Sequence, residues 1–154
     1  MKKKWLDAYM DTAKRFAKLS YAHRLKVGAV VVKDHRIISI GYNGMPAGWD
    51  NNCEIALLEN PHTAKLDEHG VPILKTRDEV IHAEANAIIK LARDGERGSG
   101  ATIFCTHAPC IECAKLIYGS GINTIYYEQE YRNTNGLFFL ERSGLIVNQL
   151  ASQE

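Results

Sequence analysis

The chain has 154 residues, of which 45% are hydrophobic and 24% are charged, a balance typical of one soluble globular domain over residues 1–154. Its 19 basic and 18 acidic residues leave a formal net charge of +1. This charge argues against a protein that grips polymeric nucleic acid through a large basic face, but it leaves room for a small anionic ligand held by one or two cations.

The cysteine content and the hydropathy pattern indicate in which cellular compartment the protein works. Four cysteines are too few for a disulfide scaffold, and Cys110 and Cys113 have a spacing that favours metal or redox chemistry in reducing surroundings. No stretch approaches the ~20 apolar residues that span a bilayer, and no apolar signal core follows the basic start at Met1–Trp5. The sequence therefore predicts a cytoplasmic protein without membrane contact.

The first predicted elements are a helix and a hairpin. Residues 5–19 carry apolar side chains at helical spacing, which favours a helix whose role is packing. Residues 27–32 form a β-branched run typical of a buried strand, and residues 36–40 follow a tight turn at Asp34 and His35. We expect these two strands to pair antiparallel.

The middle of the chain predicts loops and then a second helix. The segment 41–48 contains three glycines and a proline, so it should break the second strand with special backbone geometry. The polar segment 51–79 predicts a long loop that is functional or carries short helices. A helix should then run from His82 to a stop at Gly95. Its predicted apolar face consists of Ala85, Ile88, Ile89 and Ala92.

The last third of the chain alternates strands and helices. Strands are predicted at residues 101–105, 122–127 and 145–147, and helices at residues 109–118 and 135–142. This alternation implies parallel pairing, because such connections place helices over the sheet. The sequence therefore predicts an α/β protein in which helices cover both faces of a five-stranded mixed sheet, in a three-layer α/β/α arrangement.

Two short segments carry the chemistry. His82 and Glu84 open one predicted helix, and Pro109, Cys110 and Cys113 open another, 28 residues after His82. Two cysteines three residues apart direct both sulfurs to one point, and the helix N-terminus helps them ionise. Two thiolates and one imidazole suit tetrahedral Zn²⁺ and leave a fourth position for a reactant, which is typical of a catalytic site.

Glu84 is expected to carry protons rather than to bind the metal. Zinc lowers the pKa of a coordinated water molecule to ~7, and a nearby carboxylate is a natural proton carrier. A His-x-Glu segment followed by Pro-Cys-x-x-Cys is the known signature of the zinc nucleobase deaminases. A redox Cys-x-x-Cys pair or a purely structural zinc is the alternative interpretation of these residues.

Other cysteines and histidines offer rival ligands. Cys105 and His107 lie close in sequence to the Cys-x-x-Cys pair, although Cys105 is expected to be buried among apolar neighbours. Cys53, His62 and His69 lie in the long polar segment, where they offer a second, structural zinc site or are simply exposed.

The chain resembles the cytidine deaminase superfamily, and within it the deoxycytidylate (dCMP) deaminases. The resemblance covers residues 27–127 and depends on the segments 41–48, 82–88 and 109–115. The zinc-binding segments define the superfamily, whereas the Gly-Tyr-Asn-Gly loop and the long insertion before His82 point to the dCMP branch. The resemblance implies the cytidine-deaminase-like fold and hydrolysis of dCMP to dUMP and ammonia, which feeds thymidylate synthesis.

The resemblance also implies particular roles. His82, Cys110 and Cys113 match the zinc ligands, and Glu84 matches the residue that passes a proton to N3 of the ring and then helps the amino group to leave as ammonia. Members of this family are usually oligomeric, often hexameric, and often activated by dCTP and inhibited by dTTP. We therefore expect a homohexamer whose regulatory nucleotide binds with Mg²⁺.

The contacts to the nucleotide are predicted from residue type and position. Arg24 is the best candidate to hold the 5′-phosphate, and Asn43 the best candidate to contact the sugar. The candidate substrate contacts are Ser20, Arg24, Lys26, Asn43, Ala83 and Tyr126. The segment containing Gly41, Tyr42 and Gly44 is a candidate site for the regulatory nucleotide, since glycine-rich backbone approaches phosphates closely. His107 and Ala108, before Pro109, are a point of departure from the family pattern, which leaves the shape of the base pocket open.

Three other functions compete with this one. A tRNA adenosine deaminase should carry more positive charge and lack the insertion at residues 51–79. A deaminase of riboflavin synthesis or of a free base needs no grip on a phosphate. A zinc-stabilised module that only senses nucleotides would not require Glu84.

Overall fold

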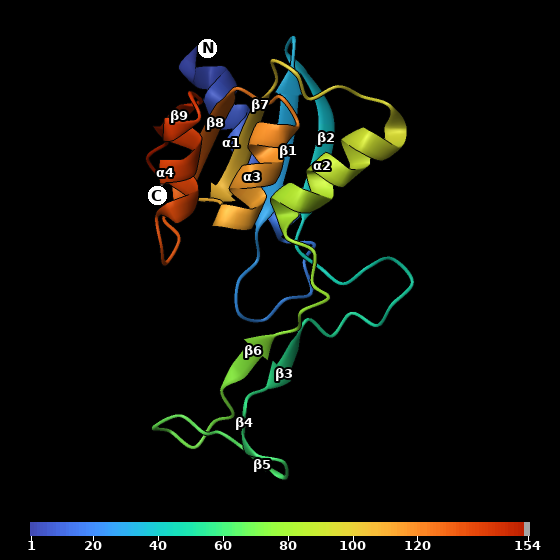
Figure 1. Ribbon diagram of the computed structural model, residues 1–154, viewed down its shortest axis with the longest axis vertical. Helices are drawn as coiled ribbons and strands as arrows, with labels where there is room; N and C mark the ends of the chain where they lie inside the picture. Colours follow the sequence, from blue (N-terminus) through green and yellow to red (C-terminus); the bar gives the residue numbers. More distant parts are fainter. Residues whose placement is uncertain (153–154) are drawn as a thin grey trace.

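A computed structural model describes residues 1–152. The chain folds around one five-stranded sheet with the strand order β2-β1-β7-β8-β9 (Figure 1). The strand β1 pairs antiparallel with both β2 and β7, whereas β7, β8 and β9 pair parallel. The predicted hairpin and the predicted mixed sheet are therefore confirmed. The bounds are β1 Gly28–Lys33, β2 Arg36–Tyr42, β7 Thr102–His107, β8 Thr124–Gln129 and β9 Ile146–Gln149.

Helices cover both faces of this sheet and create two cores. In β1, Ala29 and Val31 face the core under α2, α3 and α4, while Val30 and Val32 face the core under α1. This alternation follows from the two-residue period of a strand and explains why an uninterrupted apolar run is needed here. The helices are α1 Lys3–Ala17, α2 Ala83–Asp94, α3 Ile111–Gly119 and α4 Asn135–Arg142. The three-layer α/β/α fold is confirmed.

The buried face of α2 differs from the predicted one. Gly95 ends the helix in the left-handed conformation, as predicted. Ala83, Ala87 and Leu91 are buried, however, whereas Ile89 is 51% exposed. Small side chains face the sheet because the backbone of α2 lies unusually close to β2, and the larger isoleucine turns outward.

Gly41 explains this close approach. The second strand continues through Gly41 and Tyr42, so the prediction that it breaks at residue 41 is wrong. A Cβ atom at Gly41 would lie 2.1 Å from the carbonyl oxygen of Ala83. The missing side chain therefore lets the first turn of α2, which follows His82, rest on the sheet.

We expect Gly41→Ala to destabilise the protein by about 1–3 kcal/mol, because the methyl group must push α2 away from the sheet. The same displacement should weaken zinc binding, since the ligand His82 lies at this end of the helix. Gly44→Ala is the matched control, because nothing lies within 4 Å of a Cβ atom there. Thermal unfolding and zinc analysis of both variants test this, and equal stability of the two would contradict it.

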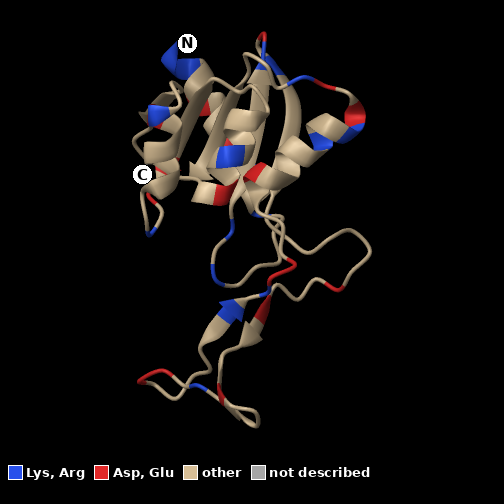
Figure 2. Cartoon of the chain, viewed as in Figure 1, with Lys and Arg blue, Asp and Glu red and all other residues tan. Residues whose placement is uncertain are grey.

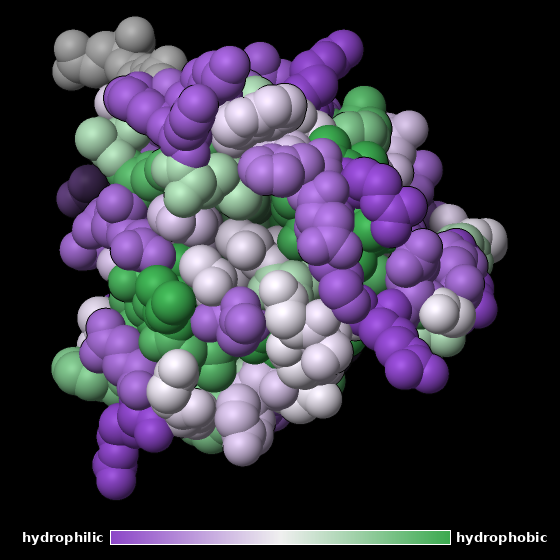
Figure 3. Space-filling view, turned by 90° about the horizontal axis from the view of Figure 1, so that it is seen from above, coloured by the Kyte–Doolittle hydropathy of each residue, from purple (hydrophilic) through white to green (hydrophobic). Residues whose placement is uncertain are grey.

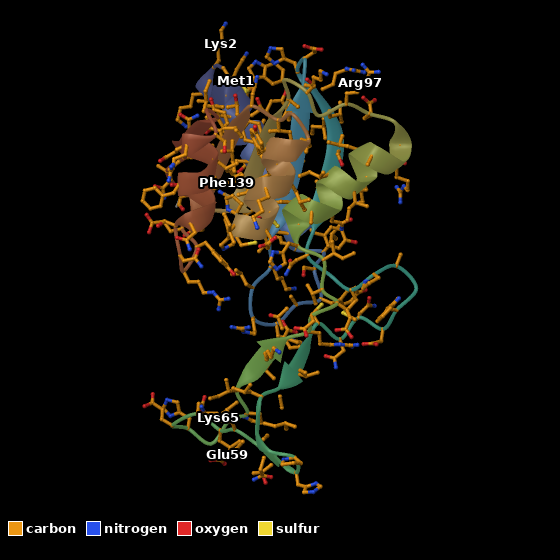
Figure 4. The ribbon with its side chains drawn as sticks, viewed as in Figure 1. Met1, Lys2, Glu59, Lys65, Arg97 and Phe139 are labelled. Carbon is orange, nitrogen blue, oxygen red and sulfur yellow. The ribbon has the colours of Figure 1, made fainter. Side chains whose placement is uncertain are left out.

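The segment before α2 forms an arm that projects from the body (Figure 1). It contains short strands, not the short helices that were one expectation for residues 51–79. They are β3 Glu54–Ala56, β4 Leu58–Asn60, β5 Thr63–Ala64 and β6 Leu74–Thr76, paired antiparallel as β3 with β6 and β4 with β5. Glu59 and Lys65 lie at the far end of the arm (Figure 4).

The surface is mixed in charge, in agreement with the small net charge. Figure 2 shows acidic and basic residues on both the body and the arm. Seen from the end with the N-terminus, hydrophilic side chains cover much of the surface, with smaller hydrophobic patches between them (Figure 3). Within residues 1–152, no helix combines the length and the apolar character that crossing a membrane requires.

Candidate metal centre and nucleotide pocket

Two helix N-termini bring the predicted ligands together. His82 immediately precedes α2, and Cys110 immediately precedes α3, both with extended backbone conformations. The Sγ atoms of Cys110 and Cys113 lie 3.6 and 3.5 Å from Nδ1 of His82. The three ligand atoms all lie within 4.8 Å of one another, and this is the only such cluster found in the described part of the chain.

This donor set fits a zinc ion. Zn–S bonds of about 2.3 Å and Zn–N bonds of about 2.0 Å in tetrahedral geometry place sulfur and nitrogen ligands about 3.5 Å apart. The observed Sγ–Nδ1 distances match that spacing. His82 Nδ1, Cys110 Sγ and Cys113 Sγ are therefore the atoms that would hold the ion.

The thiols interact with each other and with the imidazole. Their mutual hydrogen bond lowers the pKa of Cys110 and raises the pKa of Cys113, and the His82 ring also helps to lower the pKa of Cys110. Cys110 therefore ionises readily, and a thiolate is the form in which cysteine binds metals.

Glu84 lies next to this cluster, within interaction distance of Cys113 and His82. The side chain is only 4% exposed, and burial raises the pKa of its carboxyl group above the ordinary range. A hydrogen bond with Cys113 and the charge of His82 act in the opposite direction. A carboxyl group with a raised pKa holds a proton more readily than an ordinary one, which suits a group that accepts and returns protons as a general acid–base.

A cavity of about 800 Å³ opens beside Glu84 and the metal cluster. It lies between the body and the base of the arm, since both contribute to its wall. The wall includes His82, Glu84 and Cys110 as well as cationic side chains. Its cations are Arg24, Lys75 and Arg132. Besides Glu84, the acids Glu54 and Glu130 also line the cavity, so its wall is mixed in charge. The three cations beside the metal cluster are the groups that could hold an anionic ligand.

Arg24 is placed by a buried acid that sequence reasoning missed. Oε1 of Glu54 accepts hydrogen bonds from the backbone N–H groups of His23 and Arg24, at 2.9 and 3.1 Å. The Arg24 guanidinium donates to the Thr76 hydroxyl at 3.2 Å. Both anchors come from the base of the arm, so the arm fixes the direction of Arg24 in the pocket. A single acid in a polar segment gave no sequence signal for this role.

Asn43 lines the pocket but uses its side chain to hold the same loop. Its Oδ1 accepts from the Val27 N–H, and its Nδ2 donates to the Leu25 carbonyl, both at 2.8 Å. The hydroxyl of Ser20 donates to the Asn43 carbonyl at 2.7 Å. The structure therefore gives Asn43 and Ser20 a loop-holding role, and Ser20 is not part of the pocket wall.

Two other predicted phosphate contacts lie outside the pocket wall. Tyr126 packs in the core under α1 and stacks on Phe104 with ring centroids 5.1 Å apart. It therefore faces away from the metal cluster, which lies on the other side of the sheet, and the predicted contact is wrong. Lys26 is exposed beside the pocket but does not line it, whereas Ala83 does.

The rival ligands do not join the metal cluster. Cys105 is fully buried in the core, and burial raises the pKa of its thiol well above the ordinary range. His107 lines the pocket instead. Within residues 1–152, Cys53, His62 and His69 form no metal cluster, since Cys53 is buried while both histidines are exposed.

Comparisons with known proteins agree with this site. The family described as the cytidine and deoxycytidylate deaminase zinc-binding region matches residues 3–129. ComE operon protein 2 of Bacillus subtilis is 36% identical over 97% of this chain and 73% of its own length. The deoxycytidylate deaminase of Enterobacteria phage T4 is 38% identical over 69% of this chain and 68% of its own length.

A solved structure extends the similarity to the whole fold. The dCMP deaminase of cyanophage S-TIM5, crystallised with dCMP and dUMP, superposes with a TM-score of 0.83 at 39% identity, covering 97% of this chain and 99% of that one. The predicted resemblance is therefore confirmed. The family match over most of the chain, together with a His-Cys-Cys cluster in the expected place, shows that this chain belongs to the cytidine and deoxycytidylate deaminase family.

Proposed function

We propose that this deaminase hydrolyses dCMP to dUMP and ammonia. The observation that carries the proposal is that buried Glu84 lies next to the His82–Cys110–Cys113 cluster, in the wall of a pocket that Arg24, Lys75 and Arg132 also line. The S-TIM5 relative was crystallised with dCMP and dUMP, which supports the same substrate and product here.

The chain's own residues would then move the protons. When held by the cluster, zinc supplies a Lewis acid that lets water act as a nucleophile near neutral pH. Glu84 accepts a proton from the attacking water and delivers it to N3 as the oxygen joins C4. The carboxylate then takes the remaining hydroxyl proton and gives it to the amino group, so that the C4–N bond breaks and ammonia leaves.

A substrate panel tests this proposal. Purified protein loaded with zinc is incubated with dCMP, CMP, dCTP, deoxycytidine and a tRNA anticodon stem, with and without dCTP and Mg²⁺ as effectors. We expect loss of cytosine absorbance to be fastest with dCMP. Turnover of adenosine in the anticodon stem but not of dCMP would favour a tRNA deaminase, and no turnover of any substrate would favour a nucleotide-sensing module.

Arg24 is proposed to bind the 5′-phosphate. Loss of a charge-assisted hydrogen bond costs about 1.5–3 kcal/mol, so Arg24→Ala should raise the KM for dCMP by roughly 10- to 100-fold. Deoxycytidine, which lacks the phosphate, should be affected much less. Arg97→Ala is the control, because Arg97 lies at the opposite end of the molecule (Figure 4). Equal losses with both substrates would remove the phosphate role.

Regulation and assembly belong to the same proposal. By family resemblance, the enzyme forms a homohexamer in the cytoplasm, is activated by dCTP with Mg²⁺, is inhibited by dTTP and supplies dUMP for thymidylate synthesis. Gly41, Tyr42 and Gly44 remain the candidates for the regulatory nucleotide, although Gly41 also serves to seat α2. Sedimentation with and without each nucleotide, alongside dCMP kinetics, tests both statements.

A further inference from the structure

His107 occupies a position in the pocket that the reaction described above leaves without a role. It ends β7, two residues after Cys105, so its side chain emerges on the sheet face that carries the metal cluster. It is half-buried and lines the pocket. Its backbone pairs with Gln129 of β8, which positions the end of the strand at the cavity, and both residues line the cavity wall.

A short hydrogen-bond chain determines which ring nitrogen carries the proton. The Gly28 N–H donates to the Thr106 hydroxyl oxygen at 3.1 Å, and that oxygen lies 2.9 Å from Nδ1 of His107. Thr106 is 4% exposed, so its hydroxyl proton needs an acceptor within the protein. Throughout residues 1–152, His107 Nδ1 is the only acceptor within hydrogen-bond distance of this hydroxyl. If the hydroxyl donates in this way, Nδ1 accepts and Nε2 carries the ring proton.

The resulting imidazole is a neutral donor. Burial lowers the pKa of His107, and the opposing influence of the Glu128 charge is smaller. Among the described residues, no side chain or backbone atom accepts a hydrogen bond from Nε2 of His107. The neutral His107 ring in the pocket wall thus offers its Nε2–H group to a ligand in the pocket.

We propose that Nε2–H of His107 donates a hydrogen bond to an oxygen of the bound nucleotide, and that Thr106 sets the tautomer that makes this possible. The inference rests on the proposed function, since it takes the occupant to be a deoxycytidine nucleotide. Two oxygens of that ligand share the required acceptor chemistry, those of the 5′-phosphate and the O2 carbonyl of the base. His107 is then a substrate-binding residue and Thr106 a positioning residue.

The tautomer can be observed without turnover. Nitrogen-15 NMR of histidine-labelled, zinc-loaded protein should show His107 protonated at Nε2 and unprotonated at Nδ1. Thr106→Ser, which keeps the hydroxyl group, should preserve this signature, whereas Thr106→Val should give a mixture of tautomers. A wild-type ring protonated at Nδ1 would overturn the proposal, whatever the protein's activity.

Kinetics test the contact itself. His107→Leu removes the donor, whereas His107→Gln keeps an N–H group near the position of Nε2. We expect His107→Leu to raise the KM for dCMP by roughly 3- to 10-fold and His107→Gln to recover most of that loss. If the KM for deoxycytidine is unchanged, the acceptor is the phosphate, and if it rises equally, the acceptor is the base carbonyl.

Two kinetic results would refute the contact. One is an unchanged KM for both substrates in His107→Leu, and the other is an equal loss in the leucine and glutamine variants, which would indicate a role in packing. Thermal unfolding of both variants identifies any loss that arises from instability. If the wild-type enzyme does not deaminate dCMP, the proposed function is wrong. The NMR experiment would still show which ring nitrogen of His107 carries the proton.

Discussion

Replacing Glu84 by glutamine should lower kcat for dCMP by about 10²- to 10⁴-fold while leaving the zinc content unchanged. The amide matches the carboxyl group in shape but cannot carry the proton from water to N3. Because the carboxyl group is buried and its pKa is raised, removing its charge should not lower the stability of the fold. Steady-state kinetics, zinc analysis and thermal unfolding of the same preparation measure all three quantities.

Glu112→Gln is the matched control for this experiment. Glu112 lies between the two metal-binding cysteines in sequence, but its side chain is exposed and pairs with Lys115 on the surface. We expect this variant to keep wild-type turnover and zinc content. If Glu84→Gln loses its zinc, Glu84 is a ligand and its assignment as the proton carrier fails. If it retains full turnover, another group moves the proton.

A second large effect is expected at Cys113, a buried metal ligand, but not at Cys105, a buried core residue. Cys113→Ala removes a metal ligand, so we expect both the zinc and nearly all turnover to be lost, by roughly a thousandfold or more. Cys105→Ala removes a thiol of similar burial that packs in the core and lies outside the metal cluster. It should keep its zinc and its turnover, with at most a modest loss of stability.

The comparison of these two cysteine variants separates catalysis from packing. Zinc analysis and dCMP kinetics are measured on both after purification under reducing conditions. Equal zinc contents would contradict the assignment of Cys113 as a ligand. Loss of zinc in Cys105→Ala alone would show that the rival ligand set, with Cys105 in place of Cys113, is the correct one.

The sequence predicted the sheet and the metal cluster because both depend on local patterns. An apolar run in β1, a turn at Asp34 and His35, and helix starts at His82 and Pro109 are each encoded within a few residues. Both turn residues do have positive φ angles, 49° and 59°. The parallel pairing of β7, β8 and β9 follows from the alternation of strands and helices in the last third of the chain.

The sequence was a poorer guide where distant segments meet. The outward turn of Ile89 depends on how closely α2 approaches Gly41, a contact made across 42 residues that periodicity alone does not report. The anchoring of Arg24 by Glu54 likewise joins a loop to the arm.

The register and length of the strands decide which side chains reach the pocket, and these could not be predicted to the residue from the sequence. Tyr126 alternates with Tyr127 along β8, and a shift of one residue would have turned it toward the metal side. His107 lies at the end of its strand, where a one-residue difference in strand length decides whether it reaches the pocket. Residue type identified the metal centre, but three-dimensional placement was needed to identify the wall around it.

The central claim is that a metal ion held by His82, Cys110 and Cys113 is required for turnover. Stepwise removal of zinc with a chelator, with zinc content and dCMP turnover measured on each sample, tests it most directly. We predict that turnover falls in proportion to the zinc removed and returns when Zn²⁺ is added back. Full turnover by protein from which the zinc has been removed would contradict the account.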